Sequence, residues 1–132
     1  MCSIRTLDSI NRAVVDGAMK YGSNALYKVF LYGSYARQDY DSESDIDYMV
    51  VMDGNSADMK KLRREMLNVS EQISYDNDVV VSVLVRDKNT FETQKNILPL
   101  YKNILQEGVA LYGWYETWLV KSQIGSSTTM HR

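Results

Sequence analysis

The chain of 132 residues contains one cysteine, one histidine and no long apolar run. A single cysteine, Cys2, cannot form a disulfide within the chain, and no apolar stretch is long enough to span a membrane. Because no signal peptide is recognisable either, the sequence predicts a cytoplasmic protein that is not inserted in a membrane. The only histidine, His131, lies in a polar tail at residues 125–132, so we expect no histidine general base.

The sequence also lacks an excess of positive charge. A formal net charge of -2 does not supply the basic track that binding to duplex nucleic acid requires. The dense basic cluster at residues 60–64 is interpreted as the solvated face of a helix. With 45% apolar and 24% charged residues, the composition is typical of an ordinary globular domain.

Two carboxylates begin a β-rich run. Asp45 and Asp47 open the sequence Asp-Ile-Asp-Tyr-Met-Val-Val-Met, which is too short for a helix. Alternate side chains of a strand share a face, so the two carboxylates should lie roughly 6–7 Å apart. At an effective dielectric near 20 they repel each other by roughly 2–3 kcal/mol, which a bound Mg²⁺ or Mn²⁺ would offset. Alone, Asp-x-Asp is more typical of a solvated strand end.

A turn that can bind phosphate precedes these acids by ten residues. Residues 27–32 form another β-type run, and Gly33 ends it where a turn should open a helix near Ser34. Glycine lets the backbone approach a ligand closely, and the Ser34 hydroxyl and the following N–H groups can bind an anion. A plain strand-to-helix connection would use the same residues. The turn and the acid pair together favour a triphosphate site beside a divalent metal.

Gly-Ser, ten residues and Asp-x-Asp form the signature of the nucleotidyltransferase superfamily of the DNA polymerase beta type, which this chain resembles. Gly-Ser-Tyr-Ala-Arg and Ser-Asp-Ile-Asp are most similar to the minimal nucleotidyltransferases of prokaryotes. The resemblance implies an α+β, palm-like fold, a small mixed sheet with helices packed mainly on one face. It also implies that Gly33 and Ser34 bind the phosphates of ATP, and that Asp45 and Asp47 are the catalytic ligands of Mg²⁺ (or Mn²⁺).

Arg37, one helical turn beyond the Gly-Ser pair, has two open interpretations. It can reach a phosphate and so belong to the nucleotide-binding residues. It can equally form a salt bridge with an acid of the following loop, namely Asp39, Asp41 or Glu43.

The chain departs from the family at a third carboxylate, which relatives use as metal ligand and base in the middle of the neighbouring strand. The matching strand is predicted at residues 78–85, buried on both faces, with Ser82 as its only polar interior residue. Serine neither binds Mg²⁺ well nor accepts a proton at neutral pH. Either Asp76, Asp78 or Asp87 replaces the third acid, or two carboxylates suffice, or turnover is slow or absent.

The remaining pattern predicts one compact scaffold. Apolar spacing predicts helices over residues 4–21 and 59–73, the second capped near Ser56. Another helical region should span residues 89–107, interrupted by Pro99. We therefore predict a nucleotidyltransferase domain over residues 1–112, followed by an aromatic segment and flexible tail over residues 113–132. The aromatic run at residues 111–119 either packs on the sheet or forms a contact surface, for example between copies of the chain.

Two functions of different classes remain open. The first is transfer of AMP from ATP to a hydroxyl. Here the resemblance suggests a protein tyrosine on a small helical partner of the HEPN type, with this chain as the antitoxin of a toxin–antitoxin pair. Members of the superfamily that modify antibiotics make a small-molecule acceptor an alternative. The second function is a non-catalytic module that binds a nucleotide or a partner protein.

Overall fold

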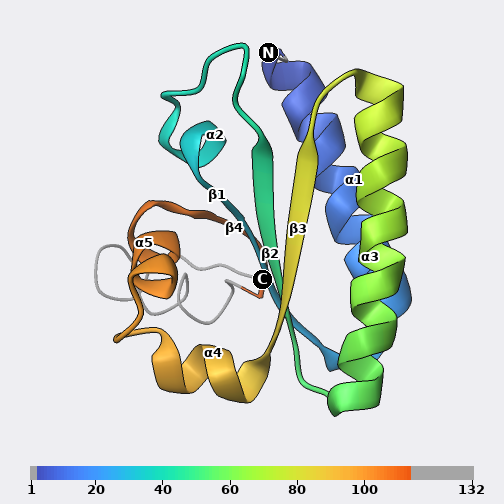
Figure 1. The fold of residues 1–132 in the computed structure, drawn as a ribbon, viewed down its shortest axis with the longest axis vertical. Coiled ribbons are helices and arrows are strands. Elements are labelled where there is room, and N and C mark those ends of the chain that lie inside the picture. The colour runs from blue at the N-terminus through green and yellow to red at the C-terminus, as the bar shows by residue number, and fades with distance from the viewer. Residues whose placement is uncertain (1–2, 114–132) are drawn as a thin grey trace, which may run out of the picture.

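The computed structural model describes residues 3–113, which form a four-stranded sheet with helices on both sides (Figure 1). Its elements, in chain order, are α1 (Ile4–Gly22), the short 3-10 helix η1 (Ser23–Ala25), β1 (Leu26–Tyr32), α2 (Ser34–Arg37), β2 (Ile46–Met52), α3 (Ser56–Asn77), β3 (Val81–Asp87), α4 (Lys88–Gln94), α5 (Pro99–Glu107) and β4 (Val109–Tyr112). Within residues 3–113, no helix is both long and apolar enough to cross a membrane. The aromatic run at 111–119, predicted either to pack on the sheet or to form a contact surface, lies mostly outside the described residues, and only its first residues, in and just after β4, are placed. The segment and tail predicted over residues 113–132 lie outside them from residue 114 on.

The sheet is mixed, as the sequence predicted. Its strand order is β3-β2-β1-β4. The central strand β1 pairs antiparallel with both β2 and β4, whereas β2 and β3 are parallel and are joined by the crossover helix α3. This topology places the start of β2 beside the end of β1, which is where the two signature segments lie.

The two long helices, α1 and α3, pack together on one face of the sheet (Figure 1). Each helix begins after a capping side chain. Before α1, the Ser3 hydroxyl accepts a hydrogen bond from the N–H of Thr6, and before α3, Asn55 forms a reciprocal capping box with Asp58. The cap predicted near Ser56 is thus the residue before it. The larger core lies on this face and includes Val14, Leu62 and Met66 of the helices and Ile46, Tyr48 and Val50 of β2.

Two short helices, α4 and α5, cover part of the opposite face. Phe91 of α4 stacks on Phe30 of β1 with ring centroids 5.7 Å apart. A smaller core forms around this pair, with Met49, Val51, Tyr101 and Ile104. Pro99 is the first residue of α5, so the predicted helical region divides at this proline. The sequence predicted helices mainly on one face, and the structure adds this thinner second layer.

β3 differs from its prediction in extent and in burial. The strand begins at Val81, because Asp78 adopts a left-handed φ of 52° and ends α3 with its N–H bonded to the Ser74 carbonyl oxygen. β3 is an edge strand, so only Val81 and Val85 are buried within it. The prediction of a strand at 78–85 that is buried on both faces was therefore wrong.

Candidate active site

The turn after β1 brings a glycine against a carboxylate. Gly33 has a φ of 78°, which residues with a Cβ rarely adopt. Its carbonyl oxygen accepts the N–H groups of Ala36 and Arg37 and so closes the single turn of α2. A Cβ on Gly33 would lie 2.7 Å from Oδ2 of Asp47, so any side chain there would displace that carboxylate. Glycine is therefore needed at position 33 both for the positive φ and for the space that the Asp47 carboxylate occupies.

Asp45 and Asp47 lie next to this turn. The Cα of Asp47 pairs with that of Tyr32, the last residue of β1, and Asp45 directly precedes β2. Burial first, and then the negative charge of Asp45, raise the pKa of the half-buried Asp47. Neither acid forms a salt bridge with a lysine or arginine in the described part of the chain. Among the described residues, no basic side chain is therefore paired with these two carboxylates.

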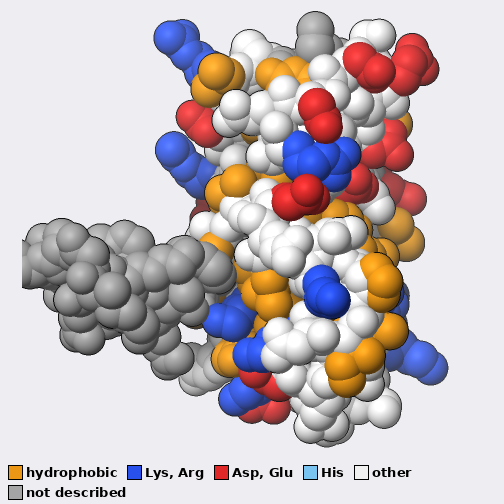
Figure 2. Space-filling view, turned by 90° about the vertical axis from the view of Figure 1, so that its left-hand side faces the viewer, with side chains coloured by type: hydrophobic (Ala, Val, Ile, Leu, Met, Phe, Trp, Pro, Cys, Tyr) orange, Lys and Arg blue, Asp and Glu red, His pale blue; other side chains and the backbone are white. Residues whose placement is uncertain are grey.

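Negative charge extends around the pair. Figure 2 shows acidic side chains gathered in the upper half of the face that carries α2 and α5. The hydroxyl of Tyr32 is affected as well, because burial and then Asp47 raise its pKa, and the positive charge of Arg86 opposes this only in part. A divalent cation would be drawn to this end of the sheet.

The carboxylate pair fits a metal ion that keeps several water ligands and also binds oxygen atoms of a substrate. Within residues 3–113, no group of three or more histidine, cysteine, aspartate or glutamate side chains could hold a metal. Mg²⁺ usually keeps several waters and is bound through one or two carboxylates together with substrate phosphates. Asp45 and Asp47 beside a phosphate-sized turn match that donor set.

None of the three flanking acids completes a metal-binding group with this pair. Asp76 accepts a hydrogen bond from Gln72 on the last turn of α3. Asp87 accepts the N–H of Thr90 and caps α4 at the far end of β3. The residue that does adjoin Asp47 is Ser82, its Cα partner in the parallel ladder. Ser82 is therefore the residue of β3 that lies beside Asp47, and its side chain is not an acid.

Arg37 is held by two carboxylates. Its Nε lies 3.1 Å from Oδ2 of Asp39, which is one of the salt bridges that the sequence left open. Its Nη1 lies 3.8 Å from Oε1 of Glu107 on α5, a contact that no sequence pattern indicated. The side chain can reach a phosphate only by exchanging these partners.

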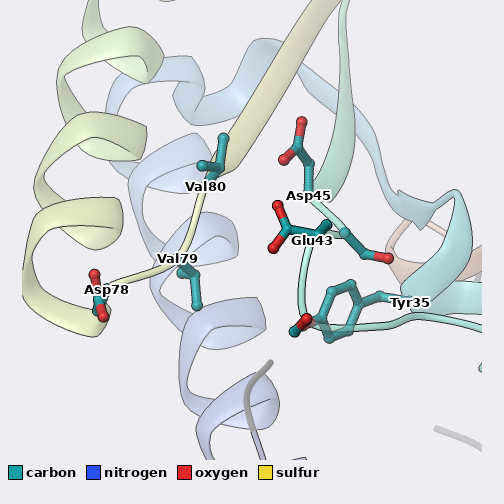
Figure 3. A pocket seen from close by; sticks show the side chains of 8 residues that line it. Tyr35, Glu43, Asp45, Asp78, Val79 and Val80 are labelled. Carbon is teal, nitrogen blue, oxygen red and sulfur yellow. The ribbon is translucent and has the colours of Figure 1, made fainter.

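A pocket of about 220 Å³ lies beside Asp45 (Figure 3). Glu43 and Asp45 project from the loop before β2, and Asp78 lies across from them at the end of α3. Tyr35, whose ring stacks on Tyr40 with centroids 4.1 Å apart, forms a further wall. The sequence did not predict Glu43 or Tyr35 at the site, and only their closeness in sequence to Asp45 and Ser34 could have indicated it.

Residues 17–111, which contain both the turn and the two carboxylates, match the nucleotidyltransferase domain family. The chain belongs to this family. It is 35% identical over 85 residues to a candidate protein adenylyltransferase of Methanocaldococcus jannaschii, and the match covers 64% of this chain and 77% of the relative. A second candidate protein adenylyltransferase of that organism is 32% identical over 63 residues, covering 48% of this chain and 62% of the relative.

The fold of this nucleotidyltransferase domain is confirmed by a solved structure. A chain of a toxin–antitoxin structure with AMP-PNP superposes with a TM-score of 0.50 at 14% identity, covering 86% of this chain and 93% of that one. At this identity the likeness concerns the fold alone. The resemblance stated from the sequence is confirmed, and the signature residues Gly33, Ser34, Asp45 and Asp47 lie at the predicted strand ends.

Proposed function

We propose that this nucleotidyltransferase-domain protein transfers AMP from ATP to a hydroxyl group of another molecule. The observation that carries the proposal is the close approach of the Asp47 carboxylate to the Gly33 turn, with Asp45 beside it. A turn suited to a triphosphate and a pair of carboxylates without a described cation partner thus lie together. The names of the two relatives support adenylyl transfer, and the AMP-PNP of the structure with the same fold makes ATP the donor to test first.

Each signature residue has a role in this proposal. Gly33 and Ser34 hold the β- and γ-phosphates through backbone N–H groups and the Ser34 hydroxyl. Asp45 and Asp47 hold Mg²⁺ (or Mn²⁺), which when bound neutralises the triphosphate and aligns its α-phosphorus. The acceptor oxygen bonds to that phosphorus while the bond to the β-phosphate oxygen breaks and pyrophosphate leaves. The acceptor proton passes to water, since no third carboxylate in the described chain joins the pair.

The acceptor in this proposal is a tyrosine of a partner protein of the HEPN type, and this chain acts as the antitoxin. Two observations support a protein acceptor. The relatives are named for transfer to proteins, and the structure with the same fold is a toxin–antitoxin structure. An antibiotic hydroxyl is the alternative acceptor, and it is tested by replacing the protein acceptor with an aminoglycoside in the labelling assay described below.

Ser82 favours a second candidate function. It adjoins Asp47 where the family resemblance implies a third acid, so the domain can keep nucleotide binding and lose efficient transfer. The protein would then be a non-catalytic module that binds a nucleotide or a partner.

Transfer is tested with ATP labelled on the α- or the γ-phosphate, in Mg²⁺, with a small helical protein of the HEPN type from the same organism as acceptor. We expect the α label to appear on the acceptor and the γ label to stay in solution. Asp45→Asn and Asp47→Asn should abolish transfer, whereas Asp53→Asn, an exposed acid at the other end of β2, should not. If ATP binds but neither label moves and no pyrophosphate forms, the non-catalytic function is correct.

A further inference from the structure

A second cavity, of about 650 Å³, lies at the opposite end of the parallel strand pair from the candidate active site. Asp45 directly precedes β2, whereas this cavity is lined by the residues that follow β2 and end β3 (lower end in Figure 1). The seven residues of β2 separate the two places by roughly 20 Å. The lining residues are Gly54, Asn55, Ser56, Met59, Lys60, Arg63, Arg86 and Asp87.

Three cations without a carboxylate partner line this cavity. Within residues 3–113, none of Lys60, Arg63 and Arg86 forms a salt bridge. The one acid of the lining, Asp87, is engaged elsewhere, because its Oδ2 accepts the N–H of Thr90 at the start of α4. Three positive charges therefore stand against a single negative one, in a chain whose formal net charge is -2.

Two of these cations converge on one oxygen atom. Nη2 of Arg63 and Nη1 of Arg86 each lie 3.0 Å from the carbonyl oxygen of Val85, so the two nitrogens are at most about 6 Å apart. Like charges at this distance repel each other, and a carbonyl oxygen offers only a partial charge. Each guanidinium keeps further N–H donors. An anion between them would relieve the repulsion and could accept paired hydrogen bonds.

We propose that this cavity binds the phosphate end of a nucleotide-sized ligand, a nucleoside mono- or diphosphate, separately from the candidate active site. Its volume lies in the range of small-molecule sites and exceeds what one inorganic ion fills. The planar guanidinium groups provide surfaces on which a base can stack. Lys60 and Arg63 belong to the basic cluster at 60–64, so part of that solvated helix face has a binding role. This proposal does not depend on the proposed transfer reaction.

The test is a titration of the full ¹⁵N-labelled chain with AMP in EDTA, so that no divalent metal joins AMP to Asp45 and Asp47. We expect amide shifts at Gly54, Ser56 and Arg86, with the affinity measured by calorimetry. Arg63→Gln combined with Arg86→Gln should weaken AMP binding by at least about tenfold. The matched double variant Lys61→Gln plus Arg64→Gln removes the same charge from outside the cavity lining and should leave the affinity within about twofold.

Five results would overturn the proposal. The first four are no amide shifts at millimolar AMP, shifts confined to the Gly33 turn and its neighbours, an equal loss of affinity in the matched variant, and stronger shifts at the same amides with an acidic peptide than with AMP. Inorganic phosphate that binds as tightly as AMP would show an anion site without room for a nucleoside, which also contradicts it. If the arginine variant fails to fold, the titration of the unmodified chain still tests whether AMP binds in this cavity.

Discussion

The substitution Ser82→Asp tests whether the absent third carboxylate limits transfer. Ser82 and Asp47 are Cα partners in the parallel ladder, so their side chains share a face of neighbouring strands. Since such strands lie about 4.8 Å apart, the new carboxylate would stand roughly 5 Å from that of Asp47. There it could take the proton of the acceptor hydroxyl. A positioned general base contributes typically 10²- to 10⁴-fold, and we expect transfer in Mg²⁺ to accelerate by about that factor.

The same substitution should destabilise the protein when no metal is bound. Two carboxylates roughly 5 Å apart repel each other by about 3 kcal/mol at an effective dielectric of 20, and solvent at the half-buried Asp47 reduces this to roughly 1–3 kcal/mol. We expect the free energy of unfolding of Ser82→Asp to fall by that amount in EDTA and to recover in Mg²⁺. Denaturant unfolding under the two conditions measures the difference.

Pyrophosphate release is the appropriate assay, because it reports transfer to any hydroxyl acceptor, including water. The rate of the unmodified protein should rise with pH, where the acceptor ionises unaided, and that of Ser82→Asp should depend less on pH. Ser82→Asn is the matched control without a basic group, and Leu84→Asp places an acid beside Met49 instead. A folded Ser82→Asp protein that is no faster than the parent, or a parent already as fast as relatives with three carboxylates, would refute the reasoning.

Four further predictions concern the same site. ATP should bind only with a divalent metal. Calorimetry should therefore show ATP binding in Mg²⁺ and none either in EDTA or with the double variant Asp45→Ala plus Asp47→Ala. Equal affinity under these three conditions would contradict the metal site. Ser34→Ala should weaken triphosphate binding by about 1 kcal/mol, a typical hydrogen bond, and a variant that only unfolds would make Ser34 a turn residue. Gly33→Ala should lower the free energy of unfolding by about 1–3 kcal/mol and impair ATP binding, because of its φ of 78° and the 2.7 Å approach to Asp47. The pKa of Asp47 is raised in the folded protein, so at pH values between the ordinary and the raised pKa the unfolded state binds fewer protons at this carboxyl than the folded state does. The free energy of unfolding without metal should therefore fall as the pH rises through this range. Asp47→Asn should remove that slope in unfolding curves measured against pH in EDTA, and an unchanged slope would contradict this origin.

Features encoded by neighbouring residues were predictable from the sequence. The helix before β1, the strand ending at Tyr32 and the division of the later helical region at Pro99 all follow from local periodicity and backbone chemistry. The Gly-Ser turn and the acid pair were also predictable, because each belongs to a strand end that the apolar pattern marks. Their mutual approach followed from the family resemblance. The lack of space for a Cβ on Gly33, which would lie 2.7 Å from Oδ2 of Asp47, depends on the pairing of β1 with β2 and has no local sequence signal.

Features that depend on distant contacts were not predictable. The β propensity of Val79 and Val80 extended the predicted strand to residue 78, but the left-handed Asp78 ends α3 and delays β3. The pairing of Phe30 with Phe91 creates the second core and puts helices on both faces. In the same way, the Arg37–Glu107 contact joins residues of α2 and α5, and no local pattern encodes it.

The position of the candidate site is set by apolar side chains that would never touch a phosphate. Ile46, Tyr48 and Val50 are fully buried against α1 and α3, and the Tyr48 hydroxyl donates to Oδ1 of Asn11 at 2.5 Å. Asp47 must therefore point to the opposite face, since side chains alternate along a strand. A one-residue slip of β2 would turn Asp47 into the larger core, where an unpaired carboxylate costs several kcal/mol. The core thus holds β2 in the register that pairs Tyr32 with Asp47, and this register brings the carboxylate to the Gly33 turn.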